Sequence, residues 1–129
     1  MPVKKVFVSY DVEHDEDLWT QLVAQSTKPD SPFRVEDRSL PQSLTDDGSK
    51  RVRPRIKAVD AMIVICGQHT DAAVGVSTEV AIAQVESLPY FLLWGRPETT
   101  VVRPSVARSG DKIYAWTWDT LKRLLDGAR

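Results

Sequence analysis

The chain has 129 residues, of which 42% are apolar, and its 17 basic and 18 acidic residues give a formal net charge of −1. This size predicts one domain, spanning residues 1–129, around a single hydrophobic core. The balanced charge does not favour nucleic acid as a partner, and no apolar run approaches the roughly 20 residues that cross a membrane. An apolar run begins almost at once, without a signal-peptide core, so we expect a cytoplasmic protein with no membrane partner.

Strand-like and helix-like runs alternate in the first half of the chain. Residues 3–10, "VKKVFVSY", are largely apolar and β-branched, which predicts a buried strand. Residues 14–26 place apolar side chains at helical spacing, with acids at the start, where the helix dipole favours them. After a turn, residues 33–37 predict a second strand. A polar loop leads to a thin helix at about residues 53–59, placed there because Pro54 is tolerated only near a helix start.

The second half repeats the same alternation. The most apolar segment, "AMIVICG" at residues 61–67, predicts a central strand. A loop leads to a helix at residues 77–87, and a strand follows at 89–95. After a long irregular segment come a short strand at residues 112–116 and an amphipathic helix at 117–127.

The lone cysteine, Cys66, leaves no partner for an internal disulfide. No group of Cys and His residues has the spacing of metal ligands. We therefore predict neither a disulfide scaffold nor a metal site, and we interpret Cys66 as a buried apolar residue rather than a nucleophile.

Strands that alternate with helices at short spacing predict an α/β protein. Five such units in this length match a flavodoxin-like, doubly wound parallel sheet with strand order 2-1-3-4-5 and helices on both faces. In that order ligands bind beyond the carboxyl ends of strands 1 and 3. Two loops are therefore of interest, "SYDVEHD" at residues 9–15 and "GQHTDAAVGV" at 67–76.

Three functions that are common for this fold do not fit these loops: FMN binding, the phosphorylation of a receiver domain, and dinucleotide binding. The loop after strand 1 is acidic, which would repel the phosphate of FMN. A receiver domain needs an Asp at the end of strand 3 and a Lys at the end of strand 5, where this chain has Cys66-Gly67 and Trp116 or Trp118. No GxGxxG pattern for a dinucleotide occurs anywhere in the chain.

The polar groups that remain suit glycosyl chemistry; they are Ser9, Tyr10, Gln68, His69, Thr70 and Glu79. A nicotinamide leaving group is already cationic and departs as a neutral molecule, so its cleavage needs no general acid. One ionised carboxylate can hold the ribose and stabilise the charge that develops on it. Glu79 falls in the first turn of the expected helix, where the dipole and free N–H groups favour the ionised form. Glu79 therefore has the right chemistry for this step.

The segments "KKVFVSYD", "PDSPF", "EDRSL", "KAVDAMIVICGQHT" and "GVSTEVAIA" also carry a family resemblance. From about Val3 to Gly95 the chain resembles the bacterial TIR-like proteins that include the TIR-like subunits of the Thoeris anti-phage system. The family pattern is filled, in order, by Ser9, Tyr10, Asp11, Asp37, Ser39, Gly67, Thr70, Gly75, Val76 and Glu79.

The resemblance implies a TIR fold and, in active members, NAD as a substrate rather than a cofactor. Nicotinamide is released and an ADP-ribose derivative, often cyclic, serves as an immune signal. Glu79 is then the catalytic glutamate, and the expected substrate-binding residues are Ser9, Tyr10, Asp11, Asp37, Ser39, Gly67, His69, Thr70 and Gly75. The expected partners are a second copy of the chain, an effector reached through the nucleotide signal, and a phage-derived trigger.

Other interpretations stay open. Many TIR domains carry Trp and Cys shortly before the glutamate, where this chain has Val74, Gly75 and Ser77, so the pocket wall differs. An inactive TIR-like interaction module and a nucleoside deoxyribosyltransferase, which shares the fold and uses a Glu nucleophile, are the alternatives. Glu79 could serve only the helix dipole, and His69 could be a solvated loop residue.

Overall fold

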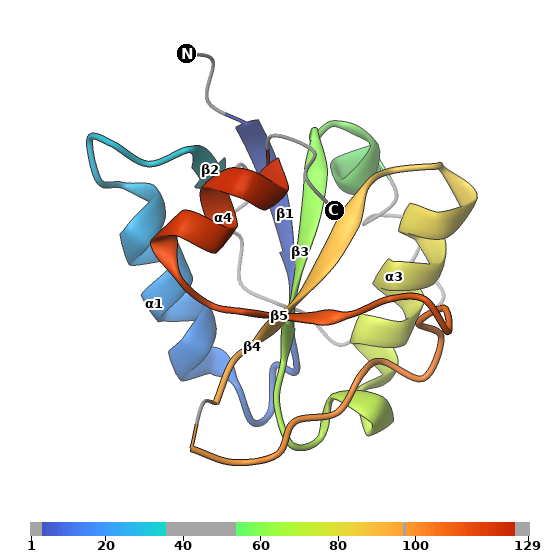
Figure 1. Cartoon of the computed structure of the whole chain (residues 1–129). Coiled ribbons are helices and arrows are strands. Elements are labelled where there is room, and N and C mark those ends of the chain that lie inside the picture. Colours follow the sequence, from blue (N-terminus) through green and yellow to red (C-terminus); the bar gives the residue numbers. More distant parts are fainter. Residues whose placement is uncertain (1–3, 36–53, 97, 126–129) are drawn as a thin grey trace.

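The protein is described by a computed structural model that covers residues 4–35, 54–96 and 98–125 (Figure 1). Two of the expected site residues, Asp37 and Ser39, and the start of the second expected helix lie outside these ranges. Residues 54–57 are helical and form the described part of that helix.

A five-stranded parallel sheet forms the centre of the molecule. Its strands are β1 (Lys4–Ser9), β2 (Phe33–Val35), β3 (Ala61–Cys66), β4 (Tyr90–Trp94) and β5 (Ile113–Ala115). Their order is β2-β1-β3-β4-β5, with every neighbouring pair parallel. The predicted doubly wound, flavodoxin-like α/β fold is confirmed.

Helices cover both faces of this sheet. They are α1 (Glu16–Ser26), the 3₁₀ turn η1 (Thr70–Ala72), α3 (Val74–Val85) and α4 (Trp118–Leu125). In Figure 1, α1 and α4 lie on one side of the strands and α3 lies on the other. None of the helices in the described ranges is long and apolar enough to cross a membrane.

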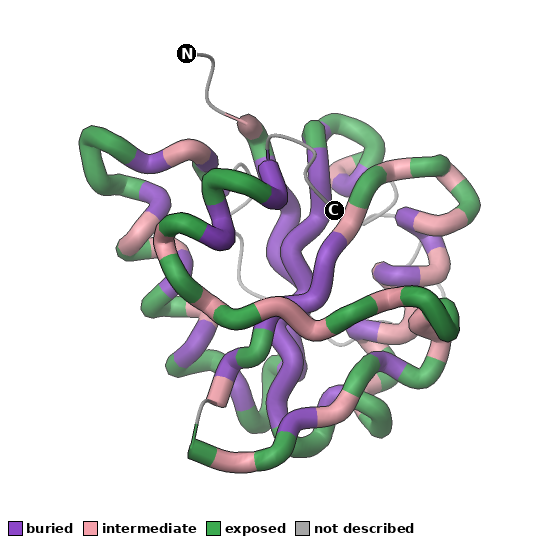
Figure 2. The backbone as a smooth tube through the Cα atoms, in the orientation of Figure 1, coloured by how far each residue is buried: buried purple, intermediate pink, exposed green. Residues whose placement is uncertain are grey.

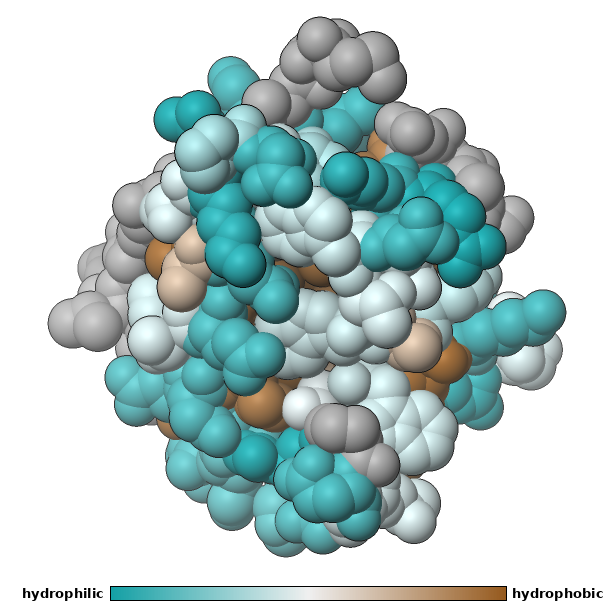
Figure 3. Space-filling view, turned by 60° about the vertical axis from the view of Figure 1, so that its left-hand side comes forward, coloured by the Kyte–Doolittle hydropathy of each residue, from teal (hydrophilic) through white to brown (hydrophobic). Residues whose placement is uncertain are grey.

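The alternation of side chains along each strand divides the core into two layers. Val6 and Val8 of β1 face α1 and α4, where they pack with Leu22 and Leu121. The layer on the α3 side includes Phe7, Met62, Val64, Val76 and Val80. Figure 2 shows the central strands as a buried column between exposed outer turns. On the face seen in Figure 3, hydrophilic residues dominate and apolar atoms appear only in small gaps.

Helix α3 begins earlier than its sequence predicts. Thr70–Ala72 form the 3₁₀ turn, and Ala73 then serves as the N-cap residue of a helix that starts at Val74. The first turn of α3 carries no acidic residue, and Glu79 lies in the second turn. The prediction that Glu79 occupies the first turn is therefore wrong, because the helix begins three residues before Ser77, without a side-chain cap to mark its start.

Gly67, which follows β3, is held close to the loop after β1. A Cβ at this position would lie 2.2 Å from Oδ2 of Asp15, a residue that is 1% exposed. Arg96 donates to Oδ1 of the same carboxyl group at 3.1 Å. The absence of a side chain at Gly67 therefore lets a buried ion pair form against the end of β3.

We expect Gly67→Ala to destabilise the fold by roughly 2–4 kcal/mol, because the added methyl group displaces the Asp15 carboxylate from its buried partner. Urea denaturation measures the change. Gly110→Ala is the matched control, since a Cβ there meets no atom within 4 Å. Equal stability of the two variants would contradict the proposed close contact.

Candidate active site

Glu79 and Ser9 meet across the junction of α3 and β1. Ser9 follows Val8, which faces α1, so its side chain points to the opposite face, toward α3. Its hydroxyl donates to Oε1 of Glu79 at 2.7 Å. Ser9 is fully buried and Glu79 is partly buried. The expected catalytic carboxylate is thus fixed by a strand residue at the predicted switch point.

Burial raises the pKa of Glu79 from its ordinary value of 4.5 to about 7. The hydrogen bond from Ser9 and the positive charge of Arg55 both oppose this rise, because they favour the ionised form. The sequence-based expectation of a carboxylate held ionised by the helix dipole is therefore wrong. Since Glu79 lies beyond the first turn, desolvation outweighs the dipole.

Tyr10 lies next to this pair but faces the other layer of the core. Its ring stacks on Trp19 with centroids 5.7 Å apart and an interplanar angle of 17°. The hydroxyl is buried and has no hydrogen-bond partner among the described residues. Burial raises the pKa of this phenol, and the nearby carboxylates of Glu16 and Glu79 raise it further.

The predicted residues of the loop after β3 have internal roles in this structure. Thr70 is fully buried, and its Oγ1 accepts a hydrogen bond from the N–H of Gly67 at 2.8 Å. This bond closes the turn that leads into η1. Gly75 lies in the first turn of α3 and is partly buried. The geometry does not bring Gly67 and Thr70 into hydrogen bonds with Glu79.

A second group of predicted residues gathers around two imidazole rings. Asp11 is buried, and its Oδ2 lies 2.7 Å from Nδ1 of His14. Its Oδ1 accepts from the N–H of Glu13 at 3.1 Å, so the carboxyl group also shapes the turn. The ring of His14 lies against that of His69, with centroids 4.1 Å apart and a tilt of 31°.

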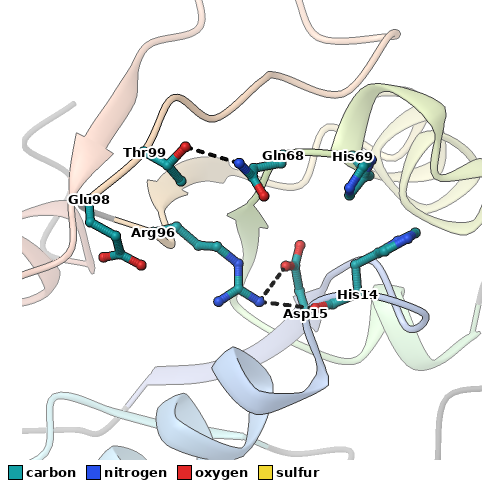
Figure 4. Close-up of a pocket in the computed structure, with 7 residues that line it drawn as sticks. All are labelled: His14, Asp15, Gln68, His69, Arg96, Glu98 and Thr99. Carbon is teal, nitrogen blue, oxygen red and sulfur yellow. Dashed lines mark hydrogen bonds and ion pairs between the residues drawn. The ribbon is translucent and has the colours of Figure 1, made fainter.

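These imidazoles border a pocket of about 420 Å³ at the carboxyl ends of β1, β3 and β4. Figure 4 shows the lining side chains, which are His14, Asp15, Gln68, His69, Arg96, Glu98 and Thr99. Ser9 and Glu79 are not among them. Across the described parts of the chain, no group of three or more His, Cys, Asp or Glu residues could hold a metal ion.

Arg96 is the one cation of this lining and was not predicted from the sequence. Its terminal nitrogens donate to Asp15 and Asp17 and to the carbonyl oxygen of His14 at 2.9–3.2 Å. These bonds join the segment after β4 to the loop after β1. The sequence does carry a signal for Arg96. It directly follows "WG" at the end of a predicted parallel strand, and this places it at the carboxyl edge of the sheet, beside the loops that follow the other strands.

Residues 7–95 match the family model described as Thoeris protein ThsB, TIR-like domain. The chain belongs to this family. No curated protein matches it. The matched segment contains Ser9 and Glu79 and ends directly before Arg96, so the ThsB pattern covers the Ser9–Glu79 pair but only part of the neighbouring pocket.

The raised pKa of Glu79 makes the stability of this ThsB-family protein depend on pH. The folded state binds the proton more tightly than the unfolded state, so stability is full below about pH 4.5 and falls as the pH rises through about 7. Glu79→Gln mimics the protonated acid. We expect it to match the wild type at pH 4.5 and to exceed it by on the order of 3 kcal/mol at pH 8, in urea titrations.

Glu13→Gln provides the control for this measurement, because Glu13 is exposed on the loop after β1. Its stability should follow that of the wild type across the same range. A constant difference between Glu79→Gln and wild type from pH 4.5 to pH 8 would show that Glu79 does not titrate near neutrality.

Proposed function

We propose that this ThsB TIR-like protein is an NAD-processing enzyme that acts in anti-phage signalling. It cleaves the bond between nicotinamide and ribose and yields an ADP-ribose derivative. The observation that supports this most strongly is the partly buried Glu79 carboxyl group, held by Ser9 at 2.7 Å at the carboxyl end of β1. Membership of a TIR-like family of the Thoeris system supports the same function.

The proposed chemistry uses the charge of Glu79 on the ribose. As the C1′–N bond breaks, its electron pair goes to nicotinamide, which leaves neutral, and positive charge develops at C1′. An ionised carboxylate stabilises this charge or bonds to C1′, and its effect is large in a site of low dielectric. Water then bonds to C1′ and gives ADP-ribose, or a nucleophile within the ADP-ribosyl group bonds to C1′ and gives a cyclic product.

The pKa of Glu79, about 7, suits a group that must be charged only when substrate is bound. The cationic nicotinamide ring would favour the carboxylate, because an opposite charge nearby lowers the pKa of an acid. The empty site would hold a partly protonated acid, which costs less to bury. NAD itself would therefore complete the ionisation of Glu79, with no further cofactor.

The wider proposal includes partners. Many sites of this kind depend on a conformational step that closes the pocket. Self-association and a phage-derived trigger are the proposed causes of that step here, and an effector protein is the proposed reader of the nucleotide product. Tyr10, Asp11, Asp37, Ser39, Gly67, His69, Thr70 and Gly75 remain proposed substrate-binding residues.

We expect Glu79→Gln to reduce nicotinamide release from NAD by about 100-fold or more, because it removes the charge that stabilises the oxocarbenium-like state. Lysates of phage-infected cells that express each variant provide any trigger, and mass spectrometry measures nicotinamide and the nucleotide product. Glu13→Gln serves as the control. Equal release by Glu79→Gln and wild type would remove Glu79 from this role.

The same assay separates the alternative functions. Base exchange on deoxynucleosides that depends on Glu79, without NAD cleavage, would identify a deoxyribosyltransferase. Phage protection that survives Glu79→Gln, with no nucleotide turnover, would identify an interaction module.

Removal of the Ser9 hydroxyl should shift the pH dependence of cleavage. The Ser9 hydrogen bond lowers the pKa of Glu79, so Ser9→Ala should raise that pKa above about 7. Because the ionised form is the active one, the rising limb of the pH–rate profile should move to higher pH. Ser77→Ala is the matched control, since the Ser77 hydroxyl contacts Ser105 and not Glu79. An unmoved limb in Ser9→Ala would contradict the proposed positioning role.

A further inference from the structure

A short helical turn packs against α3 on the same side of the sheet. It comprises residues 54–57 and is the short green helix beside β3 in Figure 1. Its Ile56 is fully buried and belongs to the apolar layer that contains Val80 of α3. Lys57 Nζ lies 4.0 Å from Oε2 of Glu86, the C-cap residue of α3. One apolar contact and one ion pair therefore seat this turn against the helix that carries the proposed catalytic acid.

Arg55 belongs to this turn and is directed to the same acid. Its side chain is partly buried, and its positive charge favours the ionised form of Glu79. Glu79 and Glu86 are seven residues apart, so they lie two turns apart on one face of α3. Lys57 reaches the second of these acids, and Arg55 is the cation that acts on the first. Each cation of the turn is therefore matched with one acid of α3.

The other groups around Glu79 come from β1 and the residue that follows it. Ser9 donates to Oε1 of Glu79 at 2.7 Å. Burial raises the pKa of the Tyr10 phenol, and the carboxylates of Glu16 and Glu79 raise it further, so this phenol stays neutral. Among the described residues, Arg55 is therefore the one positive charge that acts on this acid, and Ser9 is its one hydrogen-bond donor.

A carboxylate in this position needs a cation if it is to act in its charged form. Removal from water favours the neutral acid, and a nearby positive charge offsets part of that cost. In the proposed reaction the ionised form is the active one, because it stabilises the charge that develops at C1′. A cation that sets the ionised fraction of Glu79 therefore sets the rate at a given pH, without touching the substrate.

We propose that Arg55 is a positioning residue for NAD cleavage: from the turn before β3 it holds Glu79 in its charged form. This inference rests on the proposed function and assigns a role to a residue outside the pocket lining. Because Arg55 acts through Glu79 and not on the substrate, its removal should change kcat and leave KM as it is.

Carboxyl ¹³C NMR of the purified full-length chain tests this role without substrate. Comparison with Glu79→Gln assigns the Glu79 signal, which should titrate with a midpoint of about pH 7 in the wild type. Arg55→Gln should move this midpoint to higher pH, because the ionised form loses its cation. Arg55→Lys should return it toward the wild-type value. Lys57→Gln is the matched control, since it removes one charge from the same turn but from the partner of Glu86.

The pH dependence of nicotinamide release from NAD tests the consequence for the reaction. At pH 7, Arg55→Gln should lower kcat at least about two-fold, because a smaller fraction of Glu79 is ionised. At pH 9 the rates of the variant and the wild type should converge, since the acid is then ionised in both. Arg55→Lys should restore the wild-type profile.

The two measurements separate this inference from the function on which it rests. An unmoved Glu79 midpoint in Arg55→Gln, or an equal shift in Lys57→Gln, overturns the role of Arg55. An equal loss of kcat at pH 7 and pH 9 also overturns it, because the loss of a charge that acts through Glu79 is restored at high pH. A moved midpoint without NAD cleavage by any variant, in lysates of infected cells, supports the electrostatic coupling and overturns NAD cleavage as the function.

Discussion

The burial of β3 on both faces is the constraint on which the rest of this structure depends. Every residue of Ala61–Cys66 is buried, so the strand must be covered by helices on each side and paired along both edges. Its register sets Val64 opposite Ser9 of β1 and Cys66 opposite Trp94 of β4. The three strands therefore end near the same level, and the loops that follow them meet at one rim.

The same register explains why Glu79 and Asp15 have different surroundings. Ser9 lies opposite Val64, two residues before the end of β3, so Glu79 reaches the sheet below the rim and close to the core. Burial raises its pKa, although the hydrogen bond from Ser9 and the positive charge of Arg55 oppose this rise. Asp15 lies beyond the strand ends, and burial raises its pKa too, although the hydrogen bond and charge of Arg96 oppose this. One acid is positioned by a neutral donor and the other by a cation.

The sequence predicted the fold well because the signals of this fold are local. Strand and helix periodicity alternate along the chain, and strand order then places Ser9 and the start of the helix that carries Glu79 at one crevice. The start of α3 was missed, since "AAVGV" has no capping residue to mark it. The direction of the Glu79 pKa shift could not be predicted either. It depends on how deeply the residue is buried, and the misplaced start of α3 put Glu79 in the first turn, close to the helix end.

Other features could not be read from local patterns. The buried state of Thr70 and its bond to Gly67 depend on how tightly the turn after β3 closes. The contacts of Arg96 with the loop after β1 and with the start of α1 join residues that are 79 to 82 positions apart in the chain. A single sequence gives no signal for such a pair beyond the shared edge of the sheet. The pocket between them was therefore found only in three dimensions.

Arg96 also has a consequence for how this rim moves. From the segment after β4, its guanidinium holds the Asp15 carboxylate and the His14 carbonyl oxygen of the loop after β1, and also the Asp17 carboxylate in the first turn of α1. Neither loop can open fully without breaking several charge-assisted bonds, which are stronger than those of neutral pairs. Surface loops usually fluctuate separately and at low free energy. Here the backbone amides of the two loops would exchange with solvent together, as one cooperative unit.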